Sequence, residues 1–372
     1  MQQIYYFINK KQEIVDFLRE IVTLESPSTD KKAVNRCSAF VVENLKESGA
    51  KIKKFKQKKS GDYFLAEIGK GERKILVLTH VDTVWRVGKI SEMPFKIEKD
   101  RIFGPGVFDM KGGITMFVFA LKAINELKLK PKSKIMLFIN SEEEISSKNS
   151  KKYIEKFAKE SDYVLCLEPA LPGGAVKTRR KGVLTIKIES FGKSVHSGLD
   201  PQKGINAIEE LLTQLSFINK LREKGVSANI GKIIGGERVN IIPDKAQAFL
   251  DIRFWEKEKI KEIENFFDRM KPSVNGAKIH WEKLSFTPPM ERTRDSQALF
   301  LKAKKIAEIL NINLKQGDSG GGSDASFASY LGIPTIDGLG PNGDGAHSEN
   351  EHIIVSSLIE RTALLTELLC NL

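Results

Sequence analysis

Three segments of the chain are apolar at nearly every position: residues 74–79, 134–139 and 163–167. Continuous β-branched and leucine runs of this length are typical of strands that are covered on both faces, as in the centre of an α/β sheet. Helical spacing of apolar residues over 10–25 and a continuously apolar stretch at 114–121 predict helices that pack on such a sheet. The first half of the chain is therefore predicted to be an α/β domain.

The pattern changes from about Gly173 onward. Residues 183–189 and 246–254 alternate between apolar and polar positions, which predicts an antiparallel sheet with one solvated face. Helical stretches near 203–223 and 256–270 would cover the other face. An α+β domain is thus predicted to be inserted into the α/β domain. The predicted boundaries are 1–177 for the first part of the core domain, 178–287 for the insertion and 288–372 for the second part.

The predicted central strands lead into polar side chains. The first ends in His80 and Asp82, the second is followed by an acidic triplet that contains Glu143 and Glu144, and the third ends in Glu168. His80 and Asp82 lie two residues apart, so in an extended backbone they point to the same side. Because α/β sheets bind ligands at the carboxyl ends of their strands, we expect these groups to form a site.

A glycine-rich segment, residues 104–113, adds one more carboxylate to this set. Its four glycines and one proline exclude a regular helix or strand and predict a tight loop that presents Asp109 at the start of the core helix. Taken alone, this loop would be an ordinary turn. A second glycine-containing segment, residues 345–348, carries His347.

Imidazoles combined with carboxylates suit zinc and related metals, whereas calcium prefers an all-oxygen site. Two histidines and three carboxylates are too many for one tetrahedral zinc and match two metals that share a bridging carboxylate. The adjacent acids Glu143 and Glu144 allow one to bind metal while the other serves as general base for the attacking water. Singly, each motif has a commoner explanation, such as a solvated helix start for the acidic triplet. The interpretation depends on their recurrence at strand ends.

Five motifs in this order resemble those of the dizinc peptidase and deacylase family, which includes glutamate carboxypeptidase, acetylornithine deacetylase and succinyl-diaminopimelate desuccinylase. They are residues 79–84, 104–113, 142–144, 168–169 and 345–348. The resemblance covers essentially the whole chain and is closest to the glutamate carboxypeptidase type. It implies a mixed-sheet catalytic domain with an inserted ferredoxin-like α+β domain that serves as lid and dimerisation domain.

The resemblance also assigns roles within the site. Asp109 would bridge two zinc ions, with cobalt or manganese as alternatives. The remaining metal ligands would be His80 and Glu168 on one ion, and Glu144 and His347 on the other. Glu143 would be the general base and Asp82 would orient His80. The triplet leaves Glu142 as an alternative base, because the family often has Asp-Glu-Glu followed by glycine. The resemblance further implies a cis peptide bond between Asp109 and Met110.

The resemblance adds five residues, from the insertion and from a later glycine loop, to the expected site. His196 would reach the active site of the partner subunit in a homodimer and steady the oxyanion. Asn240 and Arg253 would bind the carboxylate end of the substrate, since an arginine fork suits a carboxylate. Gly321 and Gly322 would form a backbone cradle beside the site.

The expected function is hydrolysis of an amide bond next to a free carboxylate, in a small peptide or an N-acyl amino acid. A glutamate at the position of Glu168 is typical of deacylases and carboxypeptidases in this family. A di- or tripeptide aminopeptidase is the alternative within the family, and a non-catalytic basic binding protein is the alternative from another class.

Composition limits the kinds of binding partner and the cellular compartment that we expect for the protein. The net charge of +12 is spread along the chain, and its densest lysine run, residues 51–59, is predicted to be a solvated edge strand. With no aromatic-rich RNA motif or zinc finger beside it, we expect no nucleic acid partner. No run approaches the length of a membrane helix, and no secretory signal is recognisable. Three widely spaced cysteines favour a reducing compartment, so a cytoplasmic location is expected.

Overall fold

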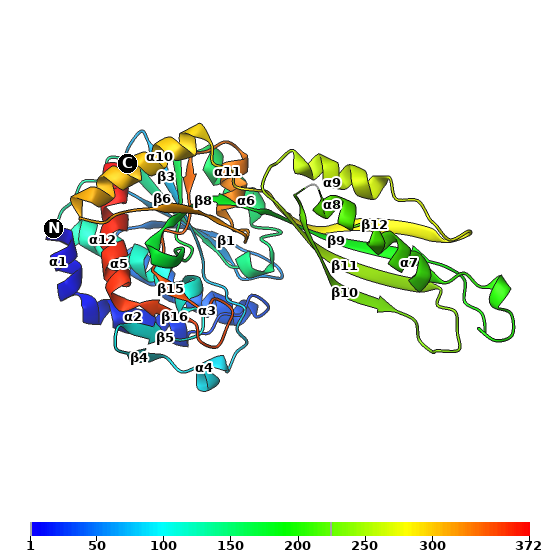
Figure 1. Ribbon diagram of the computed structural model, residues 1–372. Helices are drawn as coiled ribbons and strands as arrows, with labels where there is room; N and C mark the ends of the chain where they lie inside the picture. Colours follow the sequence, from blue (N-terminus) through cyan, green and yellow to red (C-terminus); the bar gives the residue numbers. More distant parts are fainter. Residues whose placement is uncertain (1, 224) are drawn as a thin grey trace. The chain divides into compact units, whose positions relative to one another are not determined.

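The computed structural model describes residues 2–223 and 225–372, which divide into two compact units (Figure 1). The first unit contains the described residues up to Arg179, together with Arg292–Ser319 and Ser323–Leu372. The second contains the described residues of Arg180–Glu291 and the short segment Gly320–Gly322. The fold class predicted from the sequence, α/β with a mixed sheet and an inserted α+β domain, is confirmed.

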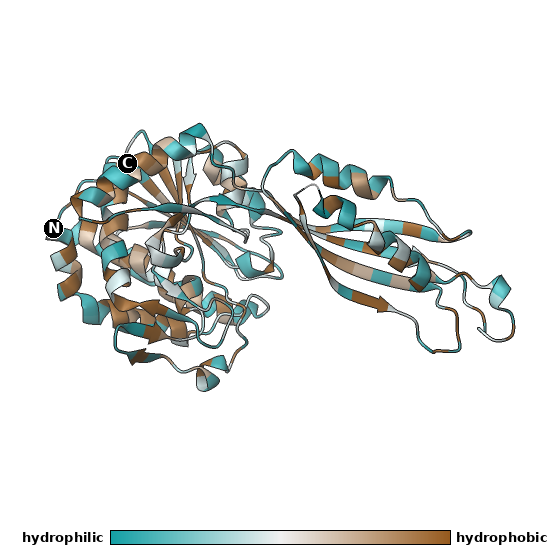
Figure 2. Cartoon of the chain, in the orientation of Figure 1, coloured by the Kyte–Doolittle hydropathy of each residue, from teal (hydrophilic) through white to brown (hydrophobic). Residues whose placement is uncertain are grey.

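A six-stranded mixed sheet forms the centre of the first unit. In spatial order its strands are β1 (Lys51–Phe55), β2 (Tyr63–Ile68), β6 (Lys134–Asn140), β3 (Lys74–His80), β7 (Tyr163–Cys166) and β14 (Thr335–Ile336). β3 pairs in parallel with both β6 and β7. The three continuously apolar segments are therefore the three neighbouring strands β6, β3 and β7, and Figure 2 shows hydrophobic strands in the centre of this unit. The lysine-rich β1 is an outermost strand that pairs antiparallel with β2.

The first unit contains α-helices, several of which pack against this sheet or against one another. They are α1 (Gln2–Asn9), α2 (Lys11–Thr23), α3 (Lys31–Glu47), α4 (Lys89–Glu92), α5 (Gly112–Glu126), α6 (Lys151–Lys159), α10 (Arg294–Ile309), α11 (Ala325–Tyr330) and α12 (Val355–Asn371). The predicted apolar stretch lies in α5, which is buried on nearly all sides and packs against α12, α2 and α3. None of the helices in the described residues is long and apolar enough to cross a membrane.

Two small sheets bring distant loops of the first unit together. One has the order β15 (Gly343–Asp344), β16 (His352–Ile354), β5 (Arg101–Phe103) and β4 (Lys96–Glu98). Because β16 pairs with β5, the glycine-rich loop that follows β5 lies beside the segment between β15 and β16, which carries His347. The other small sheet pairs β8 (Val176–Arg180) with β13 (Gln316–Ser319).

The second unit has an antiparallel sheet with helices on one face. Its strands are β10 (Ser227–Gly235), β11 (Lys245–Phe254), β9 (Gly182–Phe191) and β12 (Lys278–Thr287), in that spatial order, and its helices are α7 (Ala207–Ser216), α8 (Asn219–Arg222) and α9 (Lys259–Asp268). The succession strand–helix–strand–strand–helix–strand and this strand order are ferredoxin-like. Alternation along β9 buries Leu184, Ile186 and Ile188 under the helices.

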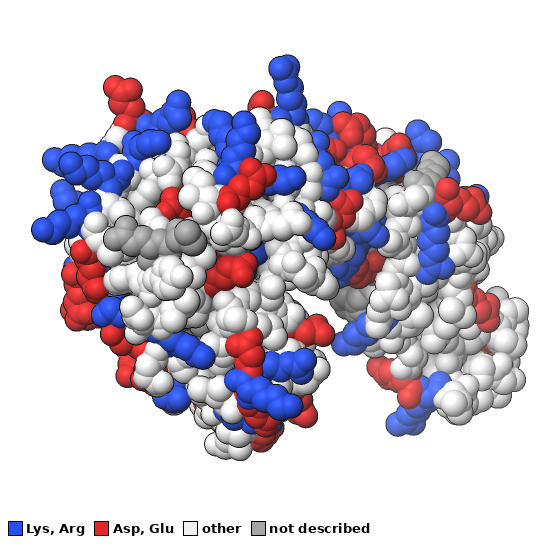
Figure 3. Space-filling view, turned by 60° about the vertical axis from the view of Figure 1, so that its left-hand side comes forward, with Lys and Arg blue, Asp and Glu red and all other residues white. Residues whose placement is uncertain are grey.

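Charged side chains of both signs are mixed on the face of the molecule that Figure 3 shows. On the face shown in Figure 3, basic and acidic groups are interspersed over the elements of both units. The net charge of +12 is therefore not gathered in one patch on that face.

Candidate metal centre

His80 is the last residue of β3 and is almost completely buried. Its Nδ1 lies 3.0 Å from the backbone oxygen of Asp82 and 3.5 Å from Oδ1 of the same residue. A carbonyl oxygen only accepts, so Nδ1 donates to it, and in the neutral ring Nε2 is left with its lone pair. That Nε2 faces Asp109 Oδ1 at 3.3 Å and Glu168 Oε1 at 3.4 Å. His80 is thus oriented as metal-binding histidines are.

Asp82 also forms hydrogen bonds to residues other than His80. Its carboxylate accepts hydrogen bonds from the backbone N–H groups of Glu143 and Glu144, each at 3.2 Å. It also accepts the hydroxyl of Ser28 at 2.7 Å. The short helical turn Glu143–Ile145, which follows β6, is therefore fixed against the end of β3. The sequence indicated the contact with His80, but it gave no signal for Ser28 or for the hold on the turn.

The carboxylate of Asp109 lies between the two predicted histidines. Oδ1 is 3.3 Å from His80 Nε2, and Oδ2 is 3.5 Å from His347 Nε2. The Asp109–Met110 peptide bond is cis, as the resemblance implied. Gly113, in the first turn of α5, allows a close approach to Leu167, the residue after β7, because a Cβ at this position would lie 2.2 Å from the backbone oxygen of Leu167. Each imidazole thus faces a different oxygen of one carboxylate.

His347 completes a second group of donors. Its Nε2 lies 3.1 Å from Glu144 Oε2, in addition to its contact with Asp109. Half of the His347 side chain is exposed, with 52% of its area open, while His80 is buried at 2%. The cluster is thereby closed on the side of His80 and open on the side of His347. The open side is where a substrate can approach.

The donor set fits metal ions. One ligand atom each of His80, Asp109 and Glu144 lies within 4.8 Å of the others, and the same holds for His80, Glu143 and Glu168. Among the described side chains, His80 Nε2 and Asp109 Oδ1 are buried polar atoms without a hydrogen-bond partner. Buried polar atoms are rarely left unsatisfied. A cation between them would satisfy both.

The raised pKa values of the two histidines also indicate that the site favours positive charge. Burial lowers the pKa of His80, but its contacts with Asp109, Asp82 and Glu168 leave that pKa well above the usual range. The contacts with Asp109 and Glu144 raise the pKa of His347 to about 10. Without metal, the cluster therefore holds protons in the positions that cations would take.

The pKa values of Glu143 and Glu144 are both raised, and burial is the largest cause. Burial and the charge of Glu168 raise the pKa of Glu143 well above its usual range. Burial and the charge of Asp109 raise the pKa of Glu144 to about 7. Burial and the negative charge of neighbouring carboxylates disfavour the ionised forms of these two groups. Shifts of this kind are typical of residues that bind a metal or transfer a proton.

Glu142 is used differently from its two neighbours. Its carboxylate accepts backbone N–H groups of Asn149 and Ser150 and the side-chain amide of Asn149. These donors precede α6, so Glu142 supplies an acceptor at the start of that helix. Glu143, by contrast, lies in the donor group with His80 and Glu168. Of the two, only Glu143 therefore lies within a group of possible metal ligands.

Asp324 is an additional buried acid near the turn of the two glutamates. It accepts hydrogen bonds from Asn140 Nδ2 at 2.6 Å and from Ser147 Oγ. Asn140 ends β6, and its own Oδ1 accepts the backbone N–H of Ser141 at 2.7 Å. Burial raises the pKa of Asp324 to about 6. The sequence placed this residue only in a glycine loop, whereas the structure ties it to the end of β6.

The predicted residues of the insertion lie in the second unit. His196 is exposed, and its loop runs beside that of Asn240, whose backbone oxygen accepts the N–H of Ser197 at 3.0 Å. The N–H of Gly198 donates to His196 Nδ1 at 3.1 Å. In the neutral ring the proton is then on Nε2, which makes this atom a hydrogen-bond donor.

Arg253 and the glycine cradle are engaged within the second unit. Arg253 donates from Nε and Nη2 to the two oxygens of Asp251, at 2.8 and 3.0 Å, and from Nη1 to the backbone oxygen of Gly320 at 2.8 Å. Arg180 Nη1 donates to the backbone oxygens of Gly321 at 3.0 Å and Gly322 at 2.8 Å. A substrate carboxylate would therefore have to exchange with Asp251 at the arginine fork.

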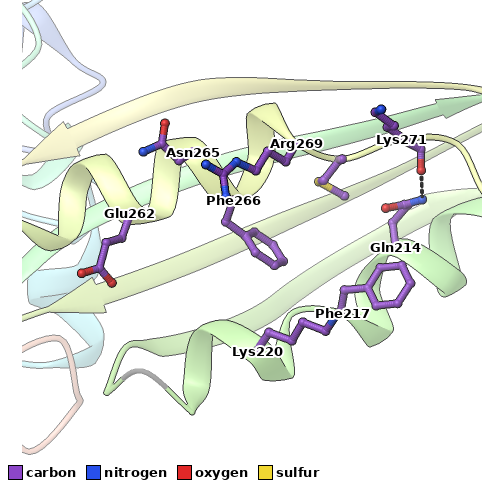
Figure 4. Close-up of a pocket in the computed structure, with 9 residues that line it drawn as sticks. Gln214, Phe217, Lys220, Glu262, Asn265, Phe266, Arg269 and Lys271 are labelled. Atoms are coloured by element: carbon purple, nitrogen blue, oxygen red, sulfur yellow. Dashed lines mark hydrogen bonds between the residues drawn. The ribbon is translucent and has the colours of Figure 1, made fainter.

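A groove of about 490 Å³ lies elsewhere in the second unit, between α9 and the α7–α8 segment (Figure 4). Its apolar wall includes Phe217, Phe266 and Met270, and Lys220, Arg269 and Lys271 also line it. No predicted site residue is among the described residues that line this groove.

The fold and the site together define a metal-dependent hydrolase of the peptidase type. The model of peptidase family M20/M25/M40 matches residues 76–371, and the chain belongs to this family. Carboxypeptidase G2 from Pseudomonas sp. is 27% identical over an alignment that covers 98% of this chain and 90% of that protein. Succinyl-diaminopimelate desuccinylase from Nitratiruptor sp. is 27% identical, covering 78% of this chain and 81% of that protein.

Solved structures show the same fold at lower identity. A tripeptidase from Staphylococcus aureus superposes with a TM-score of 0.78 at 21% identity and covers 96% of this chain and 97% of its own. A metallo-carboxypeptidase of the M20 family from Sulfolobus solfataricus gives a TM-score of 0.75 at 20% identity, with 96% and 98% covered.

Proposed function

We propose that the protein is a dinuclear zinc hydrolase that cleaves an amide bond adjacent to a free carboxylate. Its substrate would be a small peptide that loses its C-terminal residue or an N-acyl amino acid. The observation that carries the proposal is the position of Asp109, whose two oxygens face His80 on one side and His347 on the other. The similarity to carboxypeptidase G2 over nearly the whole chain favours this substrate class.

Asp109 is the proposed bridging ligand. The other proposed ligands are His80 and Glu168 for one ion and Glu144 and His347 for the other, with cobalt or manganese as alternative metals. The short distances within each pair support this division. Two bound ions would supply positive charge that makes a water more acidic and polarises the carbonyl of the scissile amide.

Glu143 is the proposed general base. Its raised pKa suits a group that takes a proton from water and returns it to the departing amine. Asp82 acts by orienting His80 and the turn that carries Glu143. Asn240 and Arg253 are proposed to bind the substrate carboxylate, with the Gly321–Gly322 segment as a backbone cradle, and His196 is proposed to donate to the oxyanion.

The first unit is proposed to be the catalytic domain and the second the lid through which a homodimer forms. The edge strand β10 supports this, because Ile233 and Ile234 on it are half exposed, at 50% and 46%. An exposed apolar edge is a ready partner for a second copy of the same strand. A cytoplasmic location suits the three cysteines, which are free thiols.

The deciding experiment compares three forms of one dipeptide in zinc- or cobalt-loaded enzyme. These are the free dipeptide, its N-acylated form and its C-terminal amide. The proposed function requires cleavage of the N-acylated form and loss of activity on the amide, because the free carboxylate is then absent. An aminopeptidase would show the reverse, since N-acylation removes the amino group that it needs.

Elemental analysis of the same preparation tests the non-catalytic alternative. The proposed enzyme should bind two metal ions per chain. A gently purified protein that binds neither zinc, cobalt nor manganese, and that cleaves none of the three substrates, would instead be the basic binding protein.

A further inference from the structure

Glu351 is a fully buried carboxylate that lies four residues after His347. Its Oε1 accepts the backbone N–H groups of Phe108 at 2.9 Å and Asp109 at 3.0 Å. Its Oε2 accepts the backbone N–H of Gly106 at 2.9 Å and the indole Nε1–H of Trp85 at 2.8 Å. One side chain thus collects four donors, three of which belong to the loop of Asp109.

A carboxylate buried in this way is stable only when it is well satisfied. An ionised carboxylate offers about four lone-pair directions, and the four N–H donors fill them. Without such contacts, moving a charged group from water into the protein interior costs several kcal/mol. Burial raises the pKa of Glu351, and the four contacts oppose that rise and so support its charged form in the interior.

The loop of Asp109 needs an acceptor from outside itself. Gly106 has a φ of 74°, and Asp109 and Met110 depart from helical backbone angles. Backbone N–H groups in such a segment cannot all be satisfied by a helix or strand, yet buried N–H groups are rarely left unpaired. The loop meets this requirement by turning three of its N–H groups toward Glu351.

We propose that Glu351 is the positioning residue of the metal centre. It fastens the loop that presents Asp109 to the segment that presents His347, and it thereby sets the distance between the bridging carboxylate and the imidazole. The inference rests on the proposed function for its two metal ions. It goes beyond that function by assigning a role in metal binding to a residue that contacts no metal.

The substitution Glu351→Gln tests this role with minimal change in shape. The amide has one acceptor oxygen, and its NH₂ group must face two of the four donors. The loop is then held by fewer hydrogen bonds, so Asp109 is no longer fixed relative to His347. We expect the dissociation constant for zinc to rise about 10- to 100-fold, the range seen when partners of metal ligands are changed. The absorption spectrum of the cobalt-loaded protein should change as well.

Glu210→Gln is the matched control. Glu210 lies in α7 of the second unit, is fully buried, and accepts the N–H groups of Ser273 at 2.9 Å and Val274 at 2.7 Å. Gln214 Nε2 donates to it as well, at 2.6 Å. The same exchange of carboxylate for amide therefore disturbs a similar network far from the metal ligands in sequence. We expect a loss of thermal stability with zinc affinity and cobalt spectrum unchanged.

Calorimetric zinc titration of the three proteins decides the proposal. An unchanged zinc dissociation constant and cobalt spectrum in Glu351→Gln, with a stability loss like that of Glu210→Gln, would overturn it. If Glu351→Gln does not fold, Trp85→Phe takes its place, because it removes one of the four donors. We expect about a 2- to 10-fold weaker zinc affinity from the loss of one hydrogen bond, and wild-type affinity would overturn the proposal.

The result is separable from the proposed function. A wild-type protein that binds two zinc ions but cleaves none of the three dipeptide forms would remove the proposed substrate class. The zinc affinities of the variants would still measure what Glu351 does.

Discussion

At the scale of single residues, Asp82 connects a metal-ligand candidate, His80, with the base candidate, Glu143. Its backbone oxygen holds Nδ1 of His80, while its carboxylate accepts the N–H groups of Glu143 and Glu144. A ligand candidate and the base candidate are therefore oriented by one residue. Because hydrogen bonds to a buried charged acceptor are worth about 1.5–3 kcal/mol each, this arrangement resists thermal displacement of the turn.

The two neighbouring glutamates should respond in opposite ways to the same substitution. Glu143→Gln removes the proposed base without changing its size, so we expect turnover to fall about 10²- to 10⁴-fold. Two metal ions should still bind. Steady-state kinetics on the N-acylated dipeptide, with metal content measured on the same samples, checks this expectation.

Glu142→Gln is the control for that experiment. Glu142 accepts backbone N–H groups at the start of α6, so its substitution should lower thermal stability and leave kcat within a few-fold of wild type. Normal turnover in Glu143→Gln together with loss in Glu142→Gln would reassign the base to Glu142.

At the scale of elements, the site residues that could be predicted are those at the ends of the apolar strands. Parallel pairing of β3 with β6 places His80 opposite Asn140, just before the acidic turn. The apolar strands were recognisable from their composition. Once the strands were located, the polar residues at their ends were located as well. Glu351 could not be predicted in this way, because its partners Gly106 and Asp109 are loop N–H groups more than 240 positions away. A hydrogen bond to distant backbone leaves no periodic trace in a sequence.

The sheet of the second unit offers a test of the charge on its solvated face. Glu189 in β9 lies 3.0 Å from Lys187 Nζ and 3.3 Å from Lys245 Nζ. The contact with Lys187, followed by that with Gln247, lowers the pKa of Glu189 to about 2 despite burial. A carboxyl group whose pKa is lower in the folded state stabilises the fold above its unfolded pKa. That contribution is lost as the pH falls toward the folded value.

We therefore expect Glu189→Gln to destabilise the protein near neutral pH by on the order of 1 kcal/mol, allowing for solvent around the lysines. The difference from wild type should shrink as the pH falls below about 4.5, where the unfolded carboxyl group takes up its proton. Urea midpoints at a series of pH values measure it. Glu282→Gln is the control, because Glu282 is largely exposed and 3.9 Å from Lys187. A Glu189 effect that is independent of pH would show that its charge contributes nothing.

At the scale of the whole molecule, the proposed active site depends on a second copy of the chain. His196 lies in the second unit, whereas the metal-ligand candidates lie in the first. The proposed homodimer assigns each His196 to the site of its partner. A symmetric dimer then has two sites, and each site combines residues from both chains.

Two inactive variants should restore activity when they are combined in one dimer. We expect Glu143→Gln and His196→Ala to be almost inactive alone, because each lacks one residue in both sites. In a mixed dimer, one site receives Glu143 from one chain and His196 from the other. Only one of the two sites in a mixed dimer is complete, so the isolated mixed dimers should show about half of the wild-type activity. Co-expression with two affinity tags, followed by kinetics on the doubly tagged fraction, measures the recovery. If the doubly tagged dimers remained as inactive as the single variants, His196 would act within its own chain or not at all, and a monomer with full activity would exclude the shared site.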